Sequence, residues 1–235
     1  CNAGNPHAAS AGLQTLLKGG NAVDAAVAMA SAMPVVEPTG NGLGADCFVI
    51  LWYEGKIYGL NASGPAPKSL SVAALKDRGF EKIPSYGVEP IDVPGAVAGW
   101  MTLHERFGKL PLEEVMAPAI RYAEEGYPVT PNISRLWQEA FENYSKYRER
   151  PEFQGWFDTF APNNTWLKPG EMFRCPDMAK TLKEIAATKG EAFYRGAIAE
   201  KIDAFFKKHN GVLSKEDRAA FNPEGVDPIS EQYHW

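Results

Sequence analysis

The chain has 235 residues, of which 45% are hydrophobic and 23% are charged, and its net charge is −5 with a sequence pI near 5.5. This is an ordinary globular composition, and a chain of this length buries about 70% of its unfolded surface. The acidic balance argues against nucleic acid or an anionic membrane as partner, and no apolar run approaches the roughly 20 residues of a membrane span.

The cysteines and the two ends of the chain do not point to a metal, disulfide or cofactor site. Three cysteines at wide spacing predict neither a disulfide framework nor a metal site, and no motif calls for a cofactor. The chain does not begin with Met, and its last residues carry no stop signal. We therefore expect residues 1–235 to be a single-domain portion of a longer precursor, and the sequence assigns no compartment.

In chain order, the first predicted elements are two helices. Residues 7–20 place apolar residues at helical spacing and end on two glycines, as many helices do. In the next helix Asn21 is the expected N-cap, and Asp24 lies near the positive end of the helix dipole. Pro34 is expected to end this helix. Small residues dominate it, which favours close packing.

A β-hairpin and a short helix follow. Two β-rich runs, 47–53 and 56–61, are joined through the sequence "EGK" (54–56), which is typical of a hairpin turn. Residues 71–79 predict a short helix that stops at Gly79.

From Pro94 the chain is expected to be mostly helical. Pro118 is expected to interrupt one helix, and residues 153–174 are rich in aromatic residues and are expected to be irregular. A short last helix at 213–221 has Ser214 ahead of Asp217, a capping signature. The order of helices, hairpin and helical half predicts an α+β fold. The other expected helical segments are 94–109, 111–127, 132–150, 175–190 and 190–211.

The segment "EPTGNGLGADCF" (37–48) contains Gly40, Gly42 and Gly44, followed by Asp46. A phosphate-binding loop would need a Lys after the glycines, and a dinucleotide fingerprint would need a strand before them and a helix after them. Neither pattern is present. The glycines either form a tight connection where backbones approach closely or shape part of a hydrolase site, and Asp46 either braces this loop or contacts substrate.

Several segments together resemble one family. They are "GGNAVDAAVA" (19–28), "GNGLGADCF" (40–48), "GLNASGPAPK" (59–68), the stretch 94–129, "EAFYRGAIAEKI" (191–202) and "GVLSKEDRAAFNPEGVDPIS" (211–230). In this order they resemble the large subunit of the γ-glutamyltranspeptidase family, whose members are N-terminal nucleophile hydrolases. The resemblance implies that the chain is part of a four-layer αββα sandwich.

The resemblance also implies a reaction. Such precursors cut themselves before a threonine, whose hydroxyl becomes the nucleophile and whose own α-amine acts as base. The acyl group of a small-molecule amide then passes to water or an amine acceptor. By the resemblance this threonine lies outside the 235 residues, so no catalytic residue is expected here and the C-terminal small subunit is an implied partner. A catalytically silent relative that binds a ligand or a protein is the alternative.

Family members hold the α-carboxylate of the γ-glutamyl group with an arginine in an "FREMAP"-like segment. Alignment on residues 66–67 places that arginine at Ser63, and the related "GSGRAP" pattern places it at Pro65; the nearest cation here is Lys68. Without the arginine, we expect γ-glutamyl recognition to weaken by about 2–4 kcal/mol, which favours another acyl group. Asn61 and Ser63 are the predicted substrate-binding residues, although both also fit a turn that ends a strand.

Overall fold

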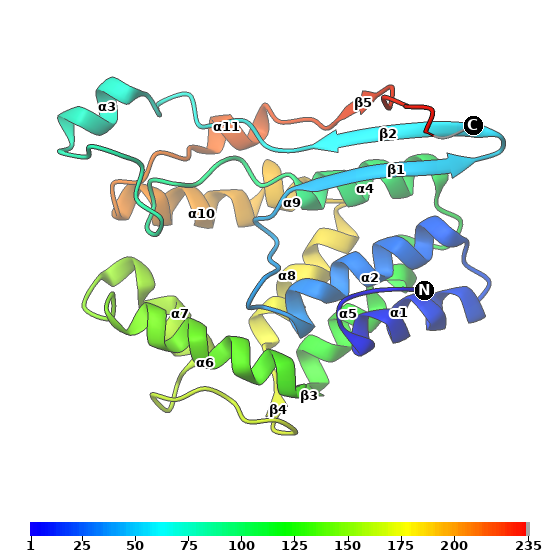
Figure 1. The fold of residues 1–235 in the computed structure, drawn as a ribbon, viewed down its shortest axis with the longest axis horizontal. Helices are drawn as coiled ribbons and strands as arrows, with labels where there is room; N and C mark the ends of the chain where they lie inside the picture. Colours follow the sequence, from blue (N-terminus) through cyan, green and yellow to red (C-terminus); the bar gives the residue numbers. More distant parts are fainter. Residues whose placement is uncertain (234–235) are drawn as a thin grey trace.

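The computed structural model describes residues 1–233, and it has the predicted α+β class, with a mostly helical second half (Figure 1). A three-stranded antiparallel sheet in the order β1–β2–β5 lies along one side of a helical body. A second, two-stranded pairing joins β3 to β4. The strands are β1 (Cys47–Tyr53), β2 (Lys56–Ala62), β3 (Tyr127–Pro128), β4 (Met172–Phe173) and β5 (Glu224–Val226).

The helices account for most of the remaining described residues. They are α1 (Pro6–Leu17), α2 (Ala22–Val36), α3 (Val72–Asp77), α4 (Ala96–Phe107), α5 (Leu112–Glu125), α6 (Pro131–Ser145), the 3-10 turn η1 (Pro151–Phe153), α7 (Gln154–Phe160), α8 (Pro176–Ala187), α9 (Glu191–Tyr194), α10 (Ala197–Lys208) and α11 (Lys215–Ala219). None of the helices in residues 1–233 has the length and apolar character needed to cross a membrane.

The start of α2 forms as predicted, and its carboxylate does more than cap. The side chain of Asn21 accepts from the Asp24 N–H at 2.9 Å, and Asp24 Oδ2 accepts from the Asn21 N–H at 2.9 Å, which completes a capping box. The buried Asp24 carboxylate also accepts from the backbone N–H groups of Lys109 and Leu110. It thereby fixes the connection between α4 and α5 against α2.

Two predicted helix breaks were wrong. Pro34 lies inside α2, which continues to Val36, and Pro118 lies inside α5, which is not interrupted. Each proline removes one backbone donor, but both side chains are buried in the helical body. Apolar burial at these two positions offsets the loss, and the helices continue.

Two further helical assignments change. The stretch 153–174 is not wholly irregular, because its aromatic residues include the buried Phe157 on α7, and Phe160 accepts a hydrogen bond from Trp137 Nε1 through its carbonyl at 2.9 Å. The segment 190–211 contains two helices, α9 and α10, separated at Gly196.

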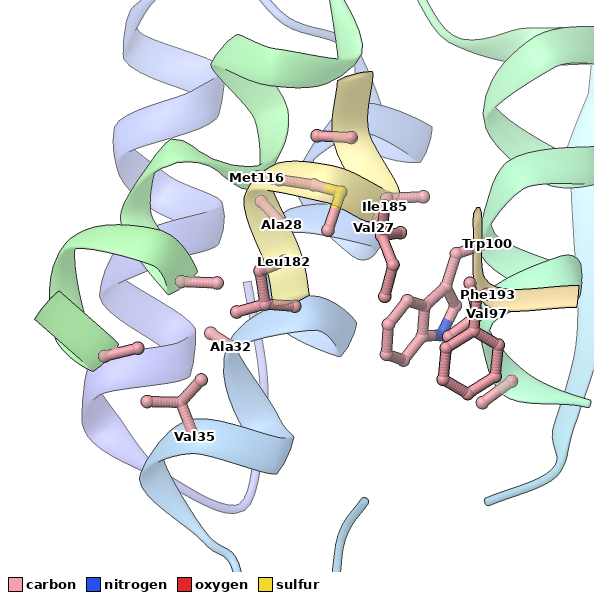
Figure 2. Close-up of a cluster of buried hydrophobic side chains, with 14 of the residues drawn as sticks. Val27, Ala28, Ala32, Val35, Val97, Trp100, Met116, Leu182, Ile185 and Phe193 are labelled. Carbon is pink, nitrogen blue, oxygen red and sulfur yellow. The ribbon is translucent and has the colours of Figure 1, made fainter. Parts of the chain in front are cut away.

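Apolar side chains of α2 occupy the middle of the helical body. Figure 2 shows Ala28 and Ala32 of α2 facing Met116 of α5 and Leu182 of α8. The small residues of α2 let these helices approach closely, as the sequence predicted. The core continues through α4 and α9 toward the sheet.

The sheet has one covered face and one open face. In the hairpin, Glu54 and Gly55 both adopt positive φ, as a two-residue turn of the type I′ kind requires. The inner face packs on α4, where a Cβ on Gly99 would lie 2.8 Å from Cys47 Cβ. The outer face, which we call the open face, carries exposed apolar side chains, with exposures of 67% for Phe48, 79% for Ile50, 68% for Trp52, 50% for Ile57 and 42% for Val226.

Candidate functional site

Three chain segments meet beside the end of β2, and we call this meeting point the junction (residues 45–46, 62–65 and 92–96). The Val93 N–H donates to the Pro65 carbonyl at 3.0 Å, and the N–H groups of Gly95 and Ala96 donate to the Ala45 carbonyl at 3.1 and 2.7 Å. The end of the glycine-rich segment therefore caps the N-terminus of α4 through its backbone.

The junction depends on two glycines that the sequence did not single out. A Cβ on Gly64 would lie 1.5 Å from the Val93 carbonyl oxygen, and one on Gly95 would lie 1.7 Å from the Ala62 carbonyl oxygen. Real side chains never approach a backbone oxygen so closely, so the three segments can meet only with glycine at both positions. The local sequence gives no signal for this, since the clashing atoms lie roughly 30 residues apart along the chain.

The predicted loop-shaping glycines are different. None of Gly40, Gly42 and Gly44 has a positive φ, and a Cβ on any of them would meet no atom of residues 1–233 closer than 3.7 Å. Within the described residues nothing requires glycine at these positions, and their loop-shaping role stays a prediction.

Asp46 joins the end of the glycine-rich segment to the segment after β2, and its expected role in shaping the loop stays a prediction. Its Oδ1 accepts from the Gly64 N–H at 3.3 Å. Burial raises the pKa of the neighbouring Asp92, and the Asp46 carboxylate raises it further. The junction therefore holds two carboxylates close enough to repel each other.

On the other side of Ser63 and Pro65 lies a hollow of about 380 Å³. The structure brings the two predicted substrate-binding residues, Asn61 and Ser63, together in its lining. Lys68 also lines it. The remaining lining residues are Pro65, Ala66, Asp217, Ala220, Phe221, Asn222 and Glu224.

Asn61 forms the turn that its position allowed and also lines the hollow, and its substrate-binding role stays a prediction. Its Oδ1 accepts from the Ser63 N–H at 2.9 Å, which forms the turn that ends β2. It also pairs in register with Phe48 on one side and with Glu224 on the other. Side chains alternate across a strand, so Asn61 shares the open face with Phe48 and Glu224. The hollow thus lies at one end of the open face.

The opposite wall of the hollow is α11, whose cap formed as predicted. Ser214 Oγ donates to Asp217 Oδ2 at 2.6 Å, and the Asp217 N–H donates back to Ser214 Oγ at 3.1 Å. What the sequence missed is a third contact: the Lys68 N–H donates to Asp217 Oδ1 at 3.1 Å. Burial by itself would raise the pKa of Asp217, but these hydrogen bonds and the positive charge of Lys68 together outweigh it and lower the pKa, so the carboxylate stays ionised.

The cations near the hollow are not equivalent. Lys68 is exposed, and its ammonium forms no ion pair with any acid of residues 1–233. Arg218 follows Asp217 in α11 but is fully buried, where it donates to the Phe193 carbonyl and lies over the Phe193 ring. Burial lowers the pKa of Arg218 to about 10. Because Arg218 is directed toward α9, it does not replace the missing arginine in the hollow.

Comparison with known proteins identifies a matching family. The profile of the family described as gamma-glutamyltranspeptidase matches residues 8–234. The "Glutathione hydrolase proenzyme" of Pseudomonas aeruginosa is 34% identical over 226 residues, a match that covers 95% of this chain and 39% of that protein.

Solved structures are similar in fold as well. The crystal structure of a cephalosporin acylase from Bacillus halodurans matches with a TM-score of 0.95 at 50% identity, over 97% of this chain and 43% of that chain. A gamma-glutamyltranspeptidase from Pseudomonas nitroreducens matches with a TM-score of 0.88 at 32% identity, over 99% of this chain and 68% of that chain. The chain spans less than half the length of the curated relatives it matches.

Proposed function

The chain belongs to the γ-glutamyltranspeptidase family and corresponds to part of its large subunit, and on this premise we propose that the whole protein is an autoprocessed enzyme that cleaves a small-molecule amide. The nucleophile is the hydroxyl of a threonine at the N-terminus of the second subunit. Its oxygen attacks the amide carbonyl carbon while its α-amine takes the hydroxyl proton and passes it to the leaving amine. Water or an acceptor amine then releases the acyl group from the resulting ester.

In this proposal the chain contributes the acyl-binding site, and the observation that carries it is the hollow at the end of β2. The hollow holds two neutral hydrogen-bonding side chains, Asn61 and Ser63, beside the apolar Pro65 and Phe221. Such a mixture of apolar lining with a few fixed polar groups is typical of small-molecule sites. The predicted residues would bind and orient the acyl group, and the reacting threonine would come from the partner subunit.

The open face is the proposed contact with that partner subunit. Its five exposed apolar side chains form a row over neighbouring strands, and large exposed apolar patches mark interaction sites. A second sheet packed on this face would complete the predicted four-layer sandwich, of which residues 1–233 supply one sheet and the helices beneath it. The hollow would then lie at the edge of the subunit contact.

Within this function, acylase chemistry is favoured over γ-glutamyl transfer. Ser63 and Pro65 stand where family members place an arginine, and a serine offers one neutral hydrogen bond where an arginine offers a charged fork. The solved structure that matches at 50% identity is named a cephalosporin acylase. We therefore propose an amide hydrolase without strict γ-glutamyl specificity.

The test uses the full-length gene product with a panel of p-nitroanilides that differ only in the acyl group. We expect hydrolysis of at least one simple acyl p-nitroanilide with a kcat/KM that exceeds the value for the γ-glutamyl compound. Preference for the γ-glutamyl compound would overturn the acylase assignment. Absence of any hydrolysis would overturn the enzyme assignment and favour a silent relative that binds a ligand.

A further inference from the structure

We propose that Asn41 is a site of spontaneous covalent modification, at which the Asn41–Gly42 pair closes to a succinimide that water opens to aspartate or isoaspartate. The site lies in the glycine-rich segment between α2 and β1, away from the lining of the hollow. The inference goes beyond the proposed function and does not depend on it.

The reaction joins two neighbouring residues and needs only water as co-reactant. The backbone nitrogen of Gly42 attacks the side-chain Cγ of Asn41, so that an N–Cγ bond forms and the Cγ–Nδ2 bond breaks. The amide nitrogen leaves as ammonia and takes up, through solvent, the proton that the Gly42 nitrogen gives up. Water then adds to either ring carbonyl. Ring opening gives an aspartate or an isoaspartate, whose side-chain carbon has become part of the backbone.

The chain contains two Asn–Gly pairs, Asn41–Gly42 and Asn210–Gly211. A glycine after the asparagine favours ring closure in both pairs, because no Cβ hinders the attacking nitrogen and the backbone rotates freely. The local sequence therefore makes both pairs reactive, and a large difference between them must come from the fold.

In the first pair the attacking nitrogen is unengaged within the described part of the chain. The Asn41 N–H donates to the Glu37 carbonyl at 3.1 Å, which ties the backbone before the pair to the end of α2. The turn that follows uses the Gly42 carbonyl, which accepts from the Ala45 N–H at 3.2 Å, but no acceptor among the described residues takes the Gly42 N–H. A Cβ on Gly42 would meet only the Gly44 nitrogen, at 3.8 Å. The backbone therefore has room to rotate into the ring geometry.

In the second pair the attacking nitrogen is held. Asn210 has a positive φ of 55° at the end of α10, and the Gly211 N–H donates to the Phe206 carbonyl at 2.7 Å. A Cβ on Gly211 would lie against the Phe206 ring and 3.1 Å from Val88 Cβ. Ring closure there requires this hydrogen bond to break and the packing to open. Asn210 is exposed whereas Asn41 is half-buried, so exposure alone predicts the opposite order of reactivity.

The product places a second carboxylate beside Glu37. Asn41 Nδ2 donates to Glu37 Oε1 at 3.3 Å, and Glu37 is the C-cap of α2. A carboxylate at position 41 replaces this contact with repulsion, at the end of a helix where negative charge is already unfavourable. Isoaspartate also lengthens the backbone of the segment that leads to Ala45, whose carbonyl caps α4. Modification should therefore loosen the connection between α2 and the junction.

The direct test follows both pairs in the full-length protein, which is incubated in heavy-oxygen water and sampled over time for peptide mass spectrometry. Because water opens the ring, each event incorporates heavy oxygen and is distinguished from modification that preceded the incubation. We expect Asn41 to convert about tenfold faster than Asn210, since only the Gly211 nitrogen must first lose a hydrogen bond. The rate at Asn41 should rise with pH, because the attacking nitrogen must lose its proton.

The same incubation in denaturant isolates the contribution of the fold. Unfolding frees the Gly211 N–H from the Phe206 carbonyl, so the two pairs should then convert at similar rates. The difference between Asn41 and Asn210 should therefore be present in the folded protein and absent in the unfolded one.

Two variants separate the modification from other properties of the segment. Gly42→Ala adds a methyl group in open space, at a residue without positive φ, and should slow the conversion of Asn41 while preserving the initial melting temperature. Gly44→Ala adds a methyl group in the same segment outside the pair and should convert at the unmodified protein's rate. After prolonged incubation, the melting temperature should fall in the unmodified protein and in Gly44→Ala, and it should fall less in Gly42→Ala.

Two results would overturn the inference. Conversion of Asn210 faster than Asn41 in the folded protein would show that exposure, and not the free N–H, decides the site. An Asn41 that stays intact in the folded protein, over an incubation that converts it in denaturant, would show that the Gly42 nitrogen is engaged in the whole protein. Neither result bears on whether the enzyme cleaves an amide.

Discussion

The helical body and the junction beside the sheet are held together in different ways. The helical body is a broad cluster of buried apolar side chains from α2, α4, α5, α8 and α9 (Figure 2). The junction is held by backbone contacts at Gly64 and Gly95, by backbone hydrogen bonds and by the Asp46 carboxylate. In the helical body the side chains are buried by packing against one another. At the junction the backbone makes the contacts, and the side chains of Ser63 and Lys68 stay exposed in the hollow.

This difference indicates where substitutions should lower the free energy of unfolding and where they should leave it nearly unchanged. A substitution in the helical body changes packed volume and lowers the free energy of unfolding. On the proposed function, a substitution of an exposed side chain beside the junction would change what the hollow binds, because the backbone that positions it is fixed by other residues. The following predictions separate these two behaviours.

The largest stability effect is expected in the helical body. Leu182 on α8 is fully buried among the α2 and α5 side chains. Leu182→Ala should lower the free energy of unfolding by about 2–5 kcal/mol, because it removes apolar contacts and leaves a cavity. Urea denaturation followed by circular dichroism measures the loss. Leu17→Ala, at a side chain 78% exposed on α1, is the control and should change it by less than about 0.5 kcal/mol.

The junction should respond to an added methyl group. Gly64→Ala places a Cβ against the Val93 carbonyl and should lower the free energy of unfolding by about 1–3 kcal/mol or more. Because residues 62–65 must shift, it should also reduce amide hydrolysis beyond the loss in folded protein. Gly44→Ala, where a Cβ would meet no described atom within 4 Å, is the matched control. Equal stability of the two variants would contradict the close approach at the junction.

A smaller effect is expected where a single cap is removed from the helical body. Asn21→Ala removes the acceptor for the Asp24 N–H and the donor to the Phe107 carbonyl, and it should lower the free energy of unfolding by about 1–2 kcal/mol. The relative rates on different acyl p-nitroanilides should not change, since α2 contributes nothing to the lining of the hollow. A changed substrate preference would show that the two regions are coupled.

The smallest effect is a pH dependence at the junction. Burial and the Asp46 carboxylate raise the pKa of Asp92, so the folded state holds this proton more tightly than the unfolded state does. Stability from this group is present at low pH and is lost as pH rises through the raised pKa. Asp92→Asn should therefore raise the melting temperature at pH 7, and the gain should vanish below about pH 4. Glu81→Gln on the exposed surface is the control, and a gain independent of pH would contradict this account.

Local patterns in the sequence predicted most of the fold. Caps at Asn21 and Ser214 and the hairpin turn formed as expected, because each depends on side chains within a few positions of one another. Pro34 and Pro118 were misinterpreted because burial in the helical body, which is a tertiary effect, offsets their local cost.

The candidate site was predictable only in part. Asn61 and Ser63 were identified through the family resemblance, and both line the hollow. The contacts that hold the hollow together were not predictable, because they join residues far apart in the sequence. Asp217 accepts a hydrogen bond from Lys68, 149 positions away, and Gly64 packs against the backbone of Val93. Neither hydrophobic periodicity nor a local motif in a single sequence predicts contacts between residues so far apart.

The central claim, that this chain is part of an autoprocessed amide-cleaving enzyme, is tested most directly by N-terminal sequencing of the full-length gene product after separation on a denaturing gel. We predict two fragments, and the smaller fragment should begin with threonine. A single uncut chain, or a fragment that begins with another residue, would contradict the account.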